Sequence, residues 1–149
     1  MNNIILIGFK CSGKTTLGKK MAEETGRHFI DTDALIKVPF SPIDVFRRAE
    51  RQVIFALQEF QNCIIATGGG TVLDPDNVVI LKKMGKLYYL RVDKEELKRR
   101  IFSEPLPTFF DPARPEESFE EMYAEREGVY EAVADEILVN ELDDIGVVF

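Results

Sequence analysis

The sequence is poor in the residues from which many catalytic and metal sites are built. Its 149 residues contain one histidine, His28, and two cysteines, Cys11 and Cys63. His28 lies in a short predicted strand and is expected to be structural, so a serine–histidine pair and a histidine-rich metal site are both excluded. The two cysteines form neither a disulfide framework nor a metal-binding spacing. We therefore expect reduced thiols in a cytoplasmic protein, with Cys63 in the core.

Long apolar runs and an excess of positive charge are also absent. No apolar stretch approaches the ~20 residues that a membrane-spanning helix needs. Residues 1–10 become polar too soon for a signal peptide. The formal net charge is -7, so a broad acidic surface would repel phosphate backbones. Neither a membrane nor a nucleic acid is expected as a partner, and a small anion would need positive charge gathered in a cleft.

The composition is that of a globular domain. Hydrophobic residues make up 45% of the chain and charged residues 30%, which provides enough apolar material for a core. At this length we predict one domain that spans residues 1–149.

Short apolar runs alternate with helical patterns along the chain. The apolar runs predict strands at residues 4–8, 28–30, 63–67, 87–92 and 137–139. The helical patterns cover residues 14–24, 43–60, 74–84, 94–101 and 116–134. Asp74 is the expected N-cap of the third helix, with Pro75 at its first position. This alternation predicts an α/β fold whose parallel sheet carries helices on both faces, with a site beyond the carboxyl ends of the strands.

A phosphate-binding motif joins the first predicted strand to the first predicted helix. Residues 8–15 read GFKCSGKT and match the pattern G-x-x-x-x-G-K-[ST]. The glycines let backbone N–H groups curl around a phosphate, and the helix N-terminus adds the positive end of its dipole. Lys14 would reach the β- and γ-phosphates, and Thr15 would hold Mg²⁺. The predicted nucleotide-binding residues of this loop are Gly8, Lys10, Cys11, Ser12, Gly13, Lys14, Thr15 and Thr16.

Two further strand ends carry residues suited to a cleft. Asp31 and Asp33 follow the second strand, where one carboxylate could hold Mg²⁺ through water and the other could deprotonate an attacking hydroxyl. Asp33 could equally be a plain helix N-cap. Gly68, Gly69 and Gly70 follow the third strand, where the lack of side chains lets a ligand approach the main chain. A flexible turn is the alternative for these glycines.

Two predicted helices carry charge on their apolar faces. The earlier helix has its apolar stripe at Ile43, Phe46, Val53, Ile54 and Leu57. Arg47 and Glu50 fall on that stripe, and Arg126 falls on the stripe of the late helix. A charge on an inward face must be paired or line a cavity. Two arginines facing a cleft would suit a carboxylate. The alternatives are an Arg47–Glu50 pair and arginines that reach solvent at the helix edge.

Taken in order, these motifs resemble those of the shikimate kinase family. The resemblance rests on GFKCSGKTT at 8–16, DTD at 31–33, FRRAE at 46–50 and ATGGG at 66–70. Near the C-terminus, REGVY at 126–130 with VAD at 133–135 is similar to the family's arginine-then-tyrosine helix. Many families share the phosphate loop, whereas the ordered set is far more specific and runs over nearly the whole chain.

The resemblance implies a P-loop kinase fold with a five-stranded parallel sheet in the order 2-3-1-4-5. It implies a monomer in which ATP is the cosubstrate, Mg²⁺ the cofactor, and the 3-hydroxyl of shikimate the acceptor of the γ-phosphoryl group. A short substrate-binding insert at about 33–60 and a mobile lid at about 103–116 would flank the site. The lid stretch holds four of the seven prolines and no periodicity.

Roles for individual residues also follow from the resemblance. Lys14 would be catalytic, Thr15 and Asp31 would serve the metal, and Asp33 would bind the substrate hydroxyls and act as the base. Arg47 and Arg126 would grip the substrate carboxylate. The substrate pocket would be lined by Gly68, Gly69 and Gly70, and Arg100 would lie near the adenine.

Three features depart from the family pattern. Where the family usually has Arg-Pro-Leu-Leu in its lid, residues 104–107 read EPLP, so Glu104 replaces a cation that offsets γ-phosphate charge. Arg114 or Lys10 would be the compensating cation. The segment between Asp33 and Arg47 is short and lacks the family's Gly-Glu pair. The tail after Asp135 is brief and leaves little room for an adenine-flanking loop.

Two other functions stay open on the sequence alone. A P-loop kinase for another small hydroxy acid or polyol, such as a gluconate-like compound, would fit the shortened substrate segment. A catalytically weak relative, which binds nucleotide as a sensor or partner, would fit the acid at Glu104.

Overall fold

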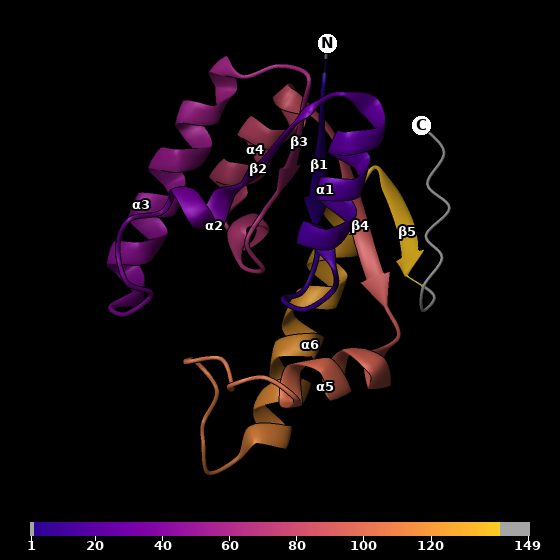
Figure 1. Cartoon of the computed structure of the whole chain (residues 1–149). Helices are drawn as coiled ribbons and strands as arrows, with labels where there is room; N and C mark the ends of the chain where they lie inside the picture. The colour runs from indigo at the N-terminus through magenta and orange to yellow at the C-terminus, as the bar shows by residue number, and fades with distance from the viewer. Residues whose placement is uncertain (1, 141–149) are drawn as a thin grey trace.

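The computed structural model of the protein describes residues 2–140. Five parallel strands form one sheet in the order β2-β3-β1-β4-β5 (Figure 1). The strands are β1 (Asn3–Ile7), β2 (His28–Asp31), β3 (Cys63–Ala66), β4 (Gly85–Val92) and β5 (Glu136–Asn140). The predicted fold class and strand order are therefore confirmed. The prediction about a brief tail concerns mostly residues 141–149, which lie outside the described residues.

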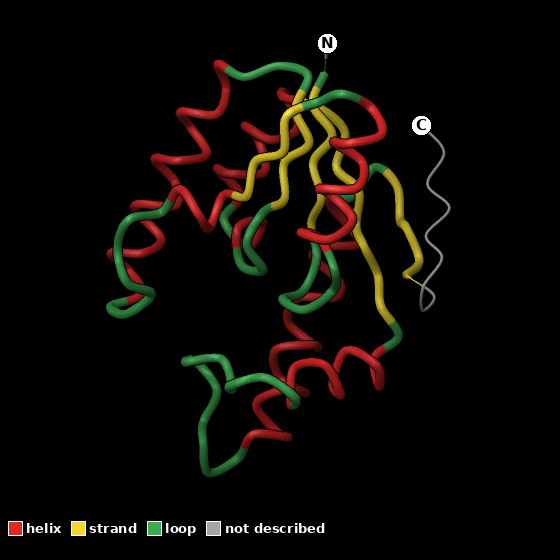
Figure 2. Tube along the Cα trace, in the orientation of Figure 1, coloured by secondary structure: helices red, strands yellow, loops and turns green. Residues whose placement is uncertain are grey.

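Helices connect the strands, as Figure 2 shows. They are α1 (Lys14–Thr25), α2 (Thr32–Leu35), α3 (Ile43–Ala56), α4 (Pro75–Met84), α5 (Lys94–Phe102) and α6 (Pro115–Val133). The caps follow the sequence: α1 ends at Gly26 with a φ of 73°, and the Asp74 side chain accepts from the Asp76 N–H at the start of α4. Within residues 2–140, no helix has the length and apolarity of a membrane-spanning segment.

The sheet is covered on both faces, and β1 shows why. Its side chains alternate, so that Ile4 and Leu6 face α1 while Ile5 and Ile7 face the larger core. The α1 face is packed with Leu17, Met21 and Ala22. The opposite face is packed with residues from α3, α4, α5 and α6, including Ile54, Leu81, Leu97 and Phe119. Both sides of the central strands are therefore buried, as their continuous apolar runs predict.

Two expectations about α2 and α3 were wrong: that Asp33 could be a helix N-cap, and that the apolar stripe of α3 faces inward along its whole length. The helix α2 begins at Thr32, so its N-cap is Asp31, whose carboxylate accepts from the Asp33 N–H at 3.0 Å. Asp33 is therefore inside the helix and free of the capping role. The apolar stripe of α3 faces inward only toward its C-terminal end, where Ile54 is buried, while Ile43 is 45% exposed. The first turns of α3 extend beyond the core toward the cleft described below.

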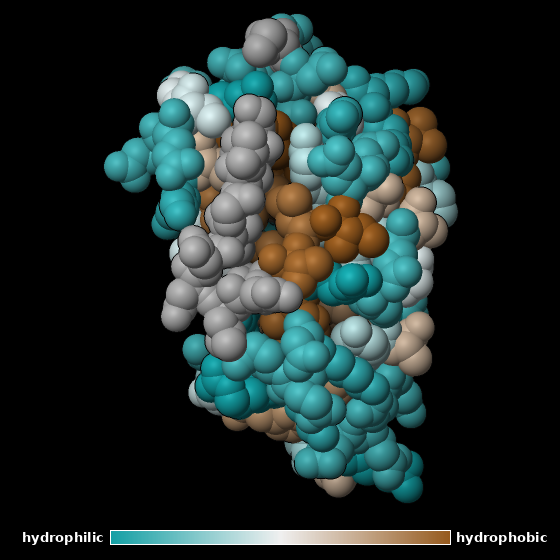
Figure 3. Space-filling model, turned by 90° about the vertical axis from the view of Figure 1, so that its right-hand side faces the viewer, coloured by the Kyte–Doolittle hydropathy of each residue, from teal (hydrophilic) through white to brown (hydrophobic). Residues whose placement is uncertain are grey.

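The edge strand β5 carries exposed apolar residues. Ile137 is 40% exposed and Val139 is 49% exposed. Figure 3, which views the side of the molecule on which β5 lies in Figure 1, shows apolar surface there. Because β2 forms the other edge of the sheet, this surface lies away from the ends of β1, β2 and β3.

The pairing of β1 with β4 depends on a glycine. Asn3 is aligned with Gly85 in the register of the two strands. A Cβ at Gly85 would overlap the main-chain carbonyl of Asn3. Asn3 cannot easily yield, because its side chain accepts from the Cys63 N–H at 2.9 Å and donates to the Phe60 carbonyl at 3.0 Å. The strands can thus pair closely only when residue 85 has no side chain.

We expect Gly85→Ala to lower the free energy of unfolding by about 1–3 kcal/mol, because β1 and β4 must separate to admit the methyl group. The matched control is Gly128→Ala in α6, where an added Cβ meets nothing within 4 Å. Alanine should stabilise that helix by about 0.5–1 kcal/mol. Urea denaturation measures both changes, and a shift of the same sign in the two variants would contradict the expectation.

Candidate active site

A cleft of about 890 Å³ lies at the carboxyl ends of β1, β2 and β3. It is lined by the phosphate loop, the residues after β2 and β3, one side of α3, the segment 103–109 and α6. All of the predicted site residues line it except Gly8, whose carbonyl accepts a hydrogen bond from Lys14. Residues separated by more than a hundred positions are thus brought to one place, where parallel α/β sheets usually bind ligands.

The phosphate loop turns tightly between β1 and α1. Gly8 and Gly13 have φ values of 143° and 98°, and Cys11 has a φ of 68°. Gly13 is the N-cap of α1 and offers no side chain to the first amides of the helix. Those amides, with the positive end of the helix dipole, are available to an anion in the cleft.

Lys14 is the buried cation of this loop. Its Nζ donates to the carbonyls of Gly8 at 2.6 Å and Phe9 at 2.8 Å. Burial lowers the pKa of Lys14 to about 8, although the nearby charges of Asp33 and Asp31 act in the opposite direction. The protein alone only partly stabilises the positive charge of Lys14. An anion bound beside this ammonium group would stabilise that charge further.

Asp33 is the carboxylate whose proton affinity is raised. Partial desolvation by the cleft walls raises the pKa of Asp33 above its ordinary value, although the residue remains exposed to solvent, and the negative charges of Asp31 and Glu50 raise it further. The cations Lys14 and Arg47 oppose the increase but do not cancel it. A carboxylate in a cleft with a raised pKa is a better proton acceptor than an ordinary aspartate.

Each glycine of Gly68–Gly70 makes room for a different charged side chain. A Cβ at Gly68 would lie 2.6 Å from Oδ1 of Asp33, and one at Gly69 would lie 3.3 Å from Nη1 of Arg126. A Cβ at Gly70 would overlap the guanidinium group of Arg47. The three glycines therefore bring two cations and a carboxylate against one short stretch of main chain.

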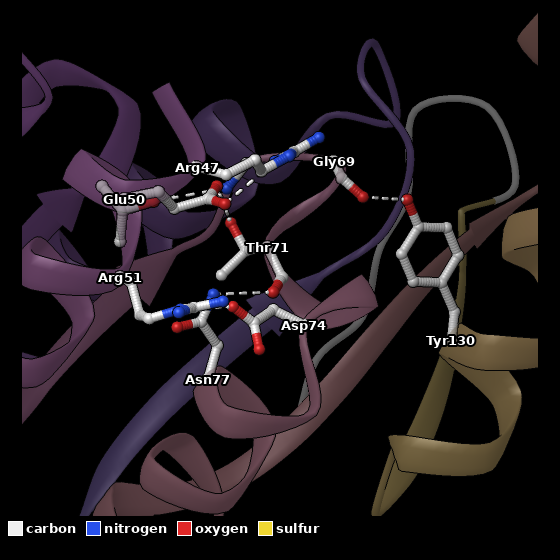
Figure 4. Close-up of polar contacts among 10 residues, drawn as sticks. Arg47, Glu50, Arg51, Gly69, Thr71, Asp74, Asn77 and Tyr130 are labelled. Atoms are coloured by element: carbon white, nitrogen blue, oxygen red, sulfur yellow. Dashed lines mark hydrogen bonds and ion pairs between the residues drawn. The ribbon is translucent and has the colours of Figure 1, made fainter. Parts of the chain in front are cut away.

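Hydrogen bonds hold this stretch in place, as Figure 4 shows. The hydroxyl of Tyr130 donates to the Gly69 carbonyl at 2.5 Å, and that of Thr71 donates to Glu50 at 2.8 Å. Asn77 donates to the Thr71 carbonyl at 3.0 Å. Burial raises the pKa of Tyr130 to about 12, so its hydroxyl remains a donor. These contacts argue against a flexible turn.

Different contacts hold the two arginines beside the glycines: an ion pair orients Arg47, and an aromatic ring packs on Arg126. Arg47 donates to Glu50 at 2.9 Å through Nη1, while its Nη2 lies against Gly70. The pair with Glu50 therefore orients Arg47 toward the cleft, so Arg47 is both ion-paired and part of the cleft lining. Arg126 is 9% exposed, and its guanidinium carbon lies over the ring of Phe109 at 4.8 Å from the centroid. Its Nε has no hydrogen-bond partner within residues 2–140.

The remaining charged residues of the cleft lie near the segment 103–109. Arg100 donates to the Cys11 carbonyl at 3.2 Å, and Glu104 lines the cleft. Arg114 instead pairs with Glu117 at 3.2 Å and does not line the cleft. Of the two cations that could compensate for Glu104, the structure thus brings only Lys10 to the cleft.

Some contributors carried little or no sequence signal. Thr71 and Asn77 lie in no recognisable motif, and their bonds link segments that are distant in the chain. Tyr130 is the tyrosine of the REGVY motif at 126–130, but that motif did not indicate its bond to Gly69.

A family model for shikimate kinase matches residues 10–146. The chain belongs to the shikimate kinase family. Similar proteins include the shikimate kinase of Syntrophus aciditrophicus, 37% identical over 158 residues, which cover 91% of this chain and 81% of the relative. The shikimate kinase of Thermoanaerobacter pseudethanolicus is 37% identical over 140 residues, which cover 87% of this chain and 82% of the relative.

Solved structures give the same result for the fold. The shikimate kinase from Acinetobacter baumannii, in complex with shikimate, has a TM-score of 0.85 and 28% identity, with 95% of this chain and 85% of the other covered. A gluconokinase from Sinorhizobium meliloti has a TM-score of 0.62 at 18% identity. This second similarity concerns the fold alone, so the shikimate kinases are the nearer group.

The raised pKa of Asp33 predicts a stability cost at neutral pH. Because the folded state holds this proton more tightly than the unfolded chain, the stability linked to Asp33 is fully present below the unfolded pKa. It is lost as the pH rises through the folded pKa. We therefore expect Asp33→Asn to raise the midpoint of thermal unfolding at pH 7.

The gain should shrink as the pH falls below about 4, where aspartate is protonated in both states. Asp44→Asn, at an exposed position in the first turn of α3, is the control and should show no such gain. A lower midpoint for Asp33→Asn at pH 7 would overturn the assignment.

Proposed function

We propose that this member of the shikimate kinase family phosphorylates the 3-hydroxyl of shikimate with ATP. The observation that carries the proposal is the row Gly68–Gly70, which brings Asp33, Arg126 and Arg47 together beside the phosphate loop. A hydroxy acid needs guanidinium groups for its carboxylate and a carboxylate for its hydroxyls. The cleft offers both on the acceptor side and a phosphate-binding helix end on the donor side.

The acceptor side would be formed by the glycines and the charges beside them. Arg47 and Arg126 bind the carboxylate of the acid, and the glycine main chain lies close to its ring. Asp33 accepts hydrogen bonds from the hydroxyls. This arrangement is supported by the orientation of Arg47 through Glu50 and by the Nε of Arg126, which no hydrogen-bond partner among residues 2–140 occupies.

The donor side would be formed by the phosphate loop. Its backbone amides and Lys14 bind the β- and γ-phosphates, and Gly8, Lys10, Cys11, Ser12, Gly13, Thr15 and Thr16 complete the loop. Arg100, which is bonded to the Cys11 carbonyl, lies on the side of the loop that we assign to adenine. Lys10 supplies the positive charge that Glu104 does not.

The residues present also fit Mg²⁺. The hydroxyl of Thr15 and the carboxylate of Asp31 both line the cleft, and Mg²⁺ prefers a few such oxygen ligands together with substrate phosphates. Residues 2–140 contain no cluster of three or more metal-binding side chains, so a site shared with the phosphates suits this chain. When bound, the ion would neutralise charge on the transferring phosphoryl group.

The chemical step follows from these positions. Asp33 accepts the proton of the 3-hydroxyl while that oxygen bonds to the γ-phosphorus and the bond from phosphorus to the bridging oxygen breaks. Lys14 stabilises the negative charge that develops. No covalent enzyme intermediate is involved. The segment 103–116 acts as a mobile lid over the site, and 33–60 is the substrate-binding insert.

The domain organisation, the oligomeric state and the cellular location of the protein belong to the same proposal. We propose that residues 1–149 form a single domain and that the protein is a monomer. The use of ATP and the two free thiols, Cys11 and Cys63, support a cytoplasmic location.

Mass spectrometry of shikimate incubated with the protein, ATP and Mg²⁺ tests the function. We expect one phosphoryl group to be added to shikimate, no product after chelation of Mg²⁺, and a loss of several orders of magnitude in turnover for Lys14→Met. Gluconate and quinate, tested as competing acceptors, should react far more slowly.

Two results would replace the proposal. Preferential phosphorylation of gluconate would indicate a kinase for another hydroxy acid. Binding of ATP in calorimetry, without transfer to any of the acids, would indicate a catalytically weak relative.

The two arginines should affect the acid and not the nucleotide. We expect Arg126→Lys and Arg47→Lys each to raise the KM for shikimate about tenfold or more, because a bidentate contact to the carboxylate is lost. The KM for ATP should stay within about twofold of the wild-type value. Arg48→Ala, an exposed neighbour on α3, is the control and should change neither constant. Equal increases in both KM values would show that these arginines do not select the acid.

A further inference from the structure

Aromatic rings from two distant segments meet at the mouth of the cleft. Phe109 belongs to the segment between α5 and α6, and Phe40 to the segment between α2 and α3. Their ring centroids are 6.2 Å apart, and Phe40 lies 5.0 Å from Phe46. All three rings line the cleft. We call the contact between Phe109 and Phe40 the aromatic bridge.

Phe109 is held in place from its own segment. The next residue, Phe110, is 4% exposed in the core, and its ring meets that of Phe109 edge-on at 5.3 Å. The Phe110 N–H donates to the Pro107 carbonyl at 3.0 Å, and the Asp111 N–H donates to Ser118 at 3.0 Å. In this conformation of the lid segment 103–116, these contacts hold the main chain on both sides of Phe109, although the Phe109 ring itself is 46% exposed.

The aromatic bridge touches both arginines of the acceptor side. The guanidinium carbon of Arg126 lies over the Phe109 ring at 4.8 Å, and that of Arg47 lies over the Phe40 ring at 6.0 Å. A ring on the face of a guanidinium group leaves its N–H edge free to bind a carboxylate. The rings also exclude water, which strengthens an ion pair made at that edge.

We propose that Phe109 selects and positions the acceptor. Resting on the proposed function, the inference is that the aromatic bridge favours a cyclic hydroxy acid whose ring offers apolar C–H surface to Phe109. An open-chain polyol acid carries a hydroxyl on nearly every carbon, and placing those hydroxyls against a phenyl ring costs their hydration. Phe109 thus acts both directly, through its apolar face, and through Arg126, by holding the guanidinium edge toward the acid.

Kinetics of Phe109→Ala test the role. We expect the KM for shikimate to rise about tenfold, the KM for ATP to stay within about twofold, and the preference for shikimate over gluconate to fall. ADP formed per phosphorylated product should rise above one, because water gains access to the site. Phe109→Trp, which keeps an aromatic face, should retain most of the preference.

Phe55→Ala is the matched control. Phe55 lies on α3, is 66% exposed and does not line the cleft, so its removal should change none of these values. If Phe109→Ala behaves like Phe55→Ala, the proposal is overturned.

Fluorescence tests the aromatic bridge without turnover. The chain has no tryptophan, so Phe109→Trp introduces a single tryptophan at the bridge, whose emission can be excited separately from that of the tyrosines. Adding Phe40→Ala or Arg126→Ala in that background should shift its emission to longer wavelength, and adding Phe55→Ala should not. If neither Phe40→Ala nor Arg126→Ala changes the emission wavelength, the aromatic bridge is absent and the inference is overturned.

The two proposals fail separately. A wild-type protein that phosphorylates no acid overturns the proposed function, and with it the acceptor role of Phe109, while the fluorescence still reports whether the bridge exists. A wild-type protein that phosphorylates shikimate, with Phe109→Ala unchanged in KM and preference, overturns only the inference about Phe109.

Discussion

The buried carboxylate of Glu50 is the constraint on which the acceptor side depends. It is 1% exposed and accepts from Arg47 and Thr71, and a buried charge is stable only when its partners stay in place. Through these two bonds α3 is tied to the turn after β3, and the guanidinium group of Arg47 is set against Gly70. Tyr130 fixes the same turn from α6. Long-range polar contacts thus assemble the site at the end of a sheet that buried apolar residues stabilise.

The cleft is rich in cations, although the chain as a whole is acidic. The chain has a net charge of -7, yet the cleft gathers cations from the phosphate loop, α3, α5 and α6. Desolvation lowers the pKa of Lys14 and raises the pKa of Asp33. A small anion that enters the cleft therefore finds compensating positive charge at short range.

The sequence predicted the strands of a parallel sheet, and the family resemblance implied their order. Every predicted site residue except Gly8 lines the cleft, because the phosphate loop and the glycine run are local patterns with fixed structural contexts. Caps such as Asp74 are local for the same reason. Some local details were not predicted: helix α2 makes Asp31 the cap, Ile43 is exposed, and Arg114 pairs with Glu117. Contacts between distant segments were not predicted either. Phe40 and Phe109 lie in segments without hydrophobic periodicity, so no sequence pattern indicates that their rings meet.

The burial of Lys14 has a consequence for how ligand binding exchanges protons with the solvent. With a pKa of about 8, the amine is partly neutral in mildly alkaline solution. A polyphosphate beside it favours the ammonium form, so binding must be accompanied by proton uptake in that range. The heat released on binding then includes the ionisation enthalpy of the buffer, and affinity for the anion declines as the solution becomes more alkaline.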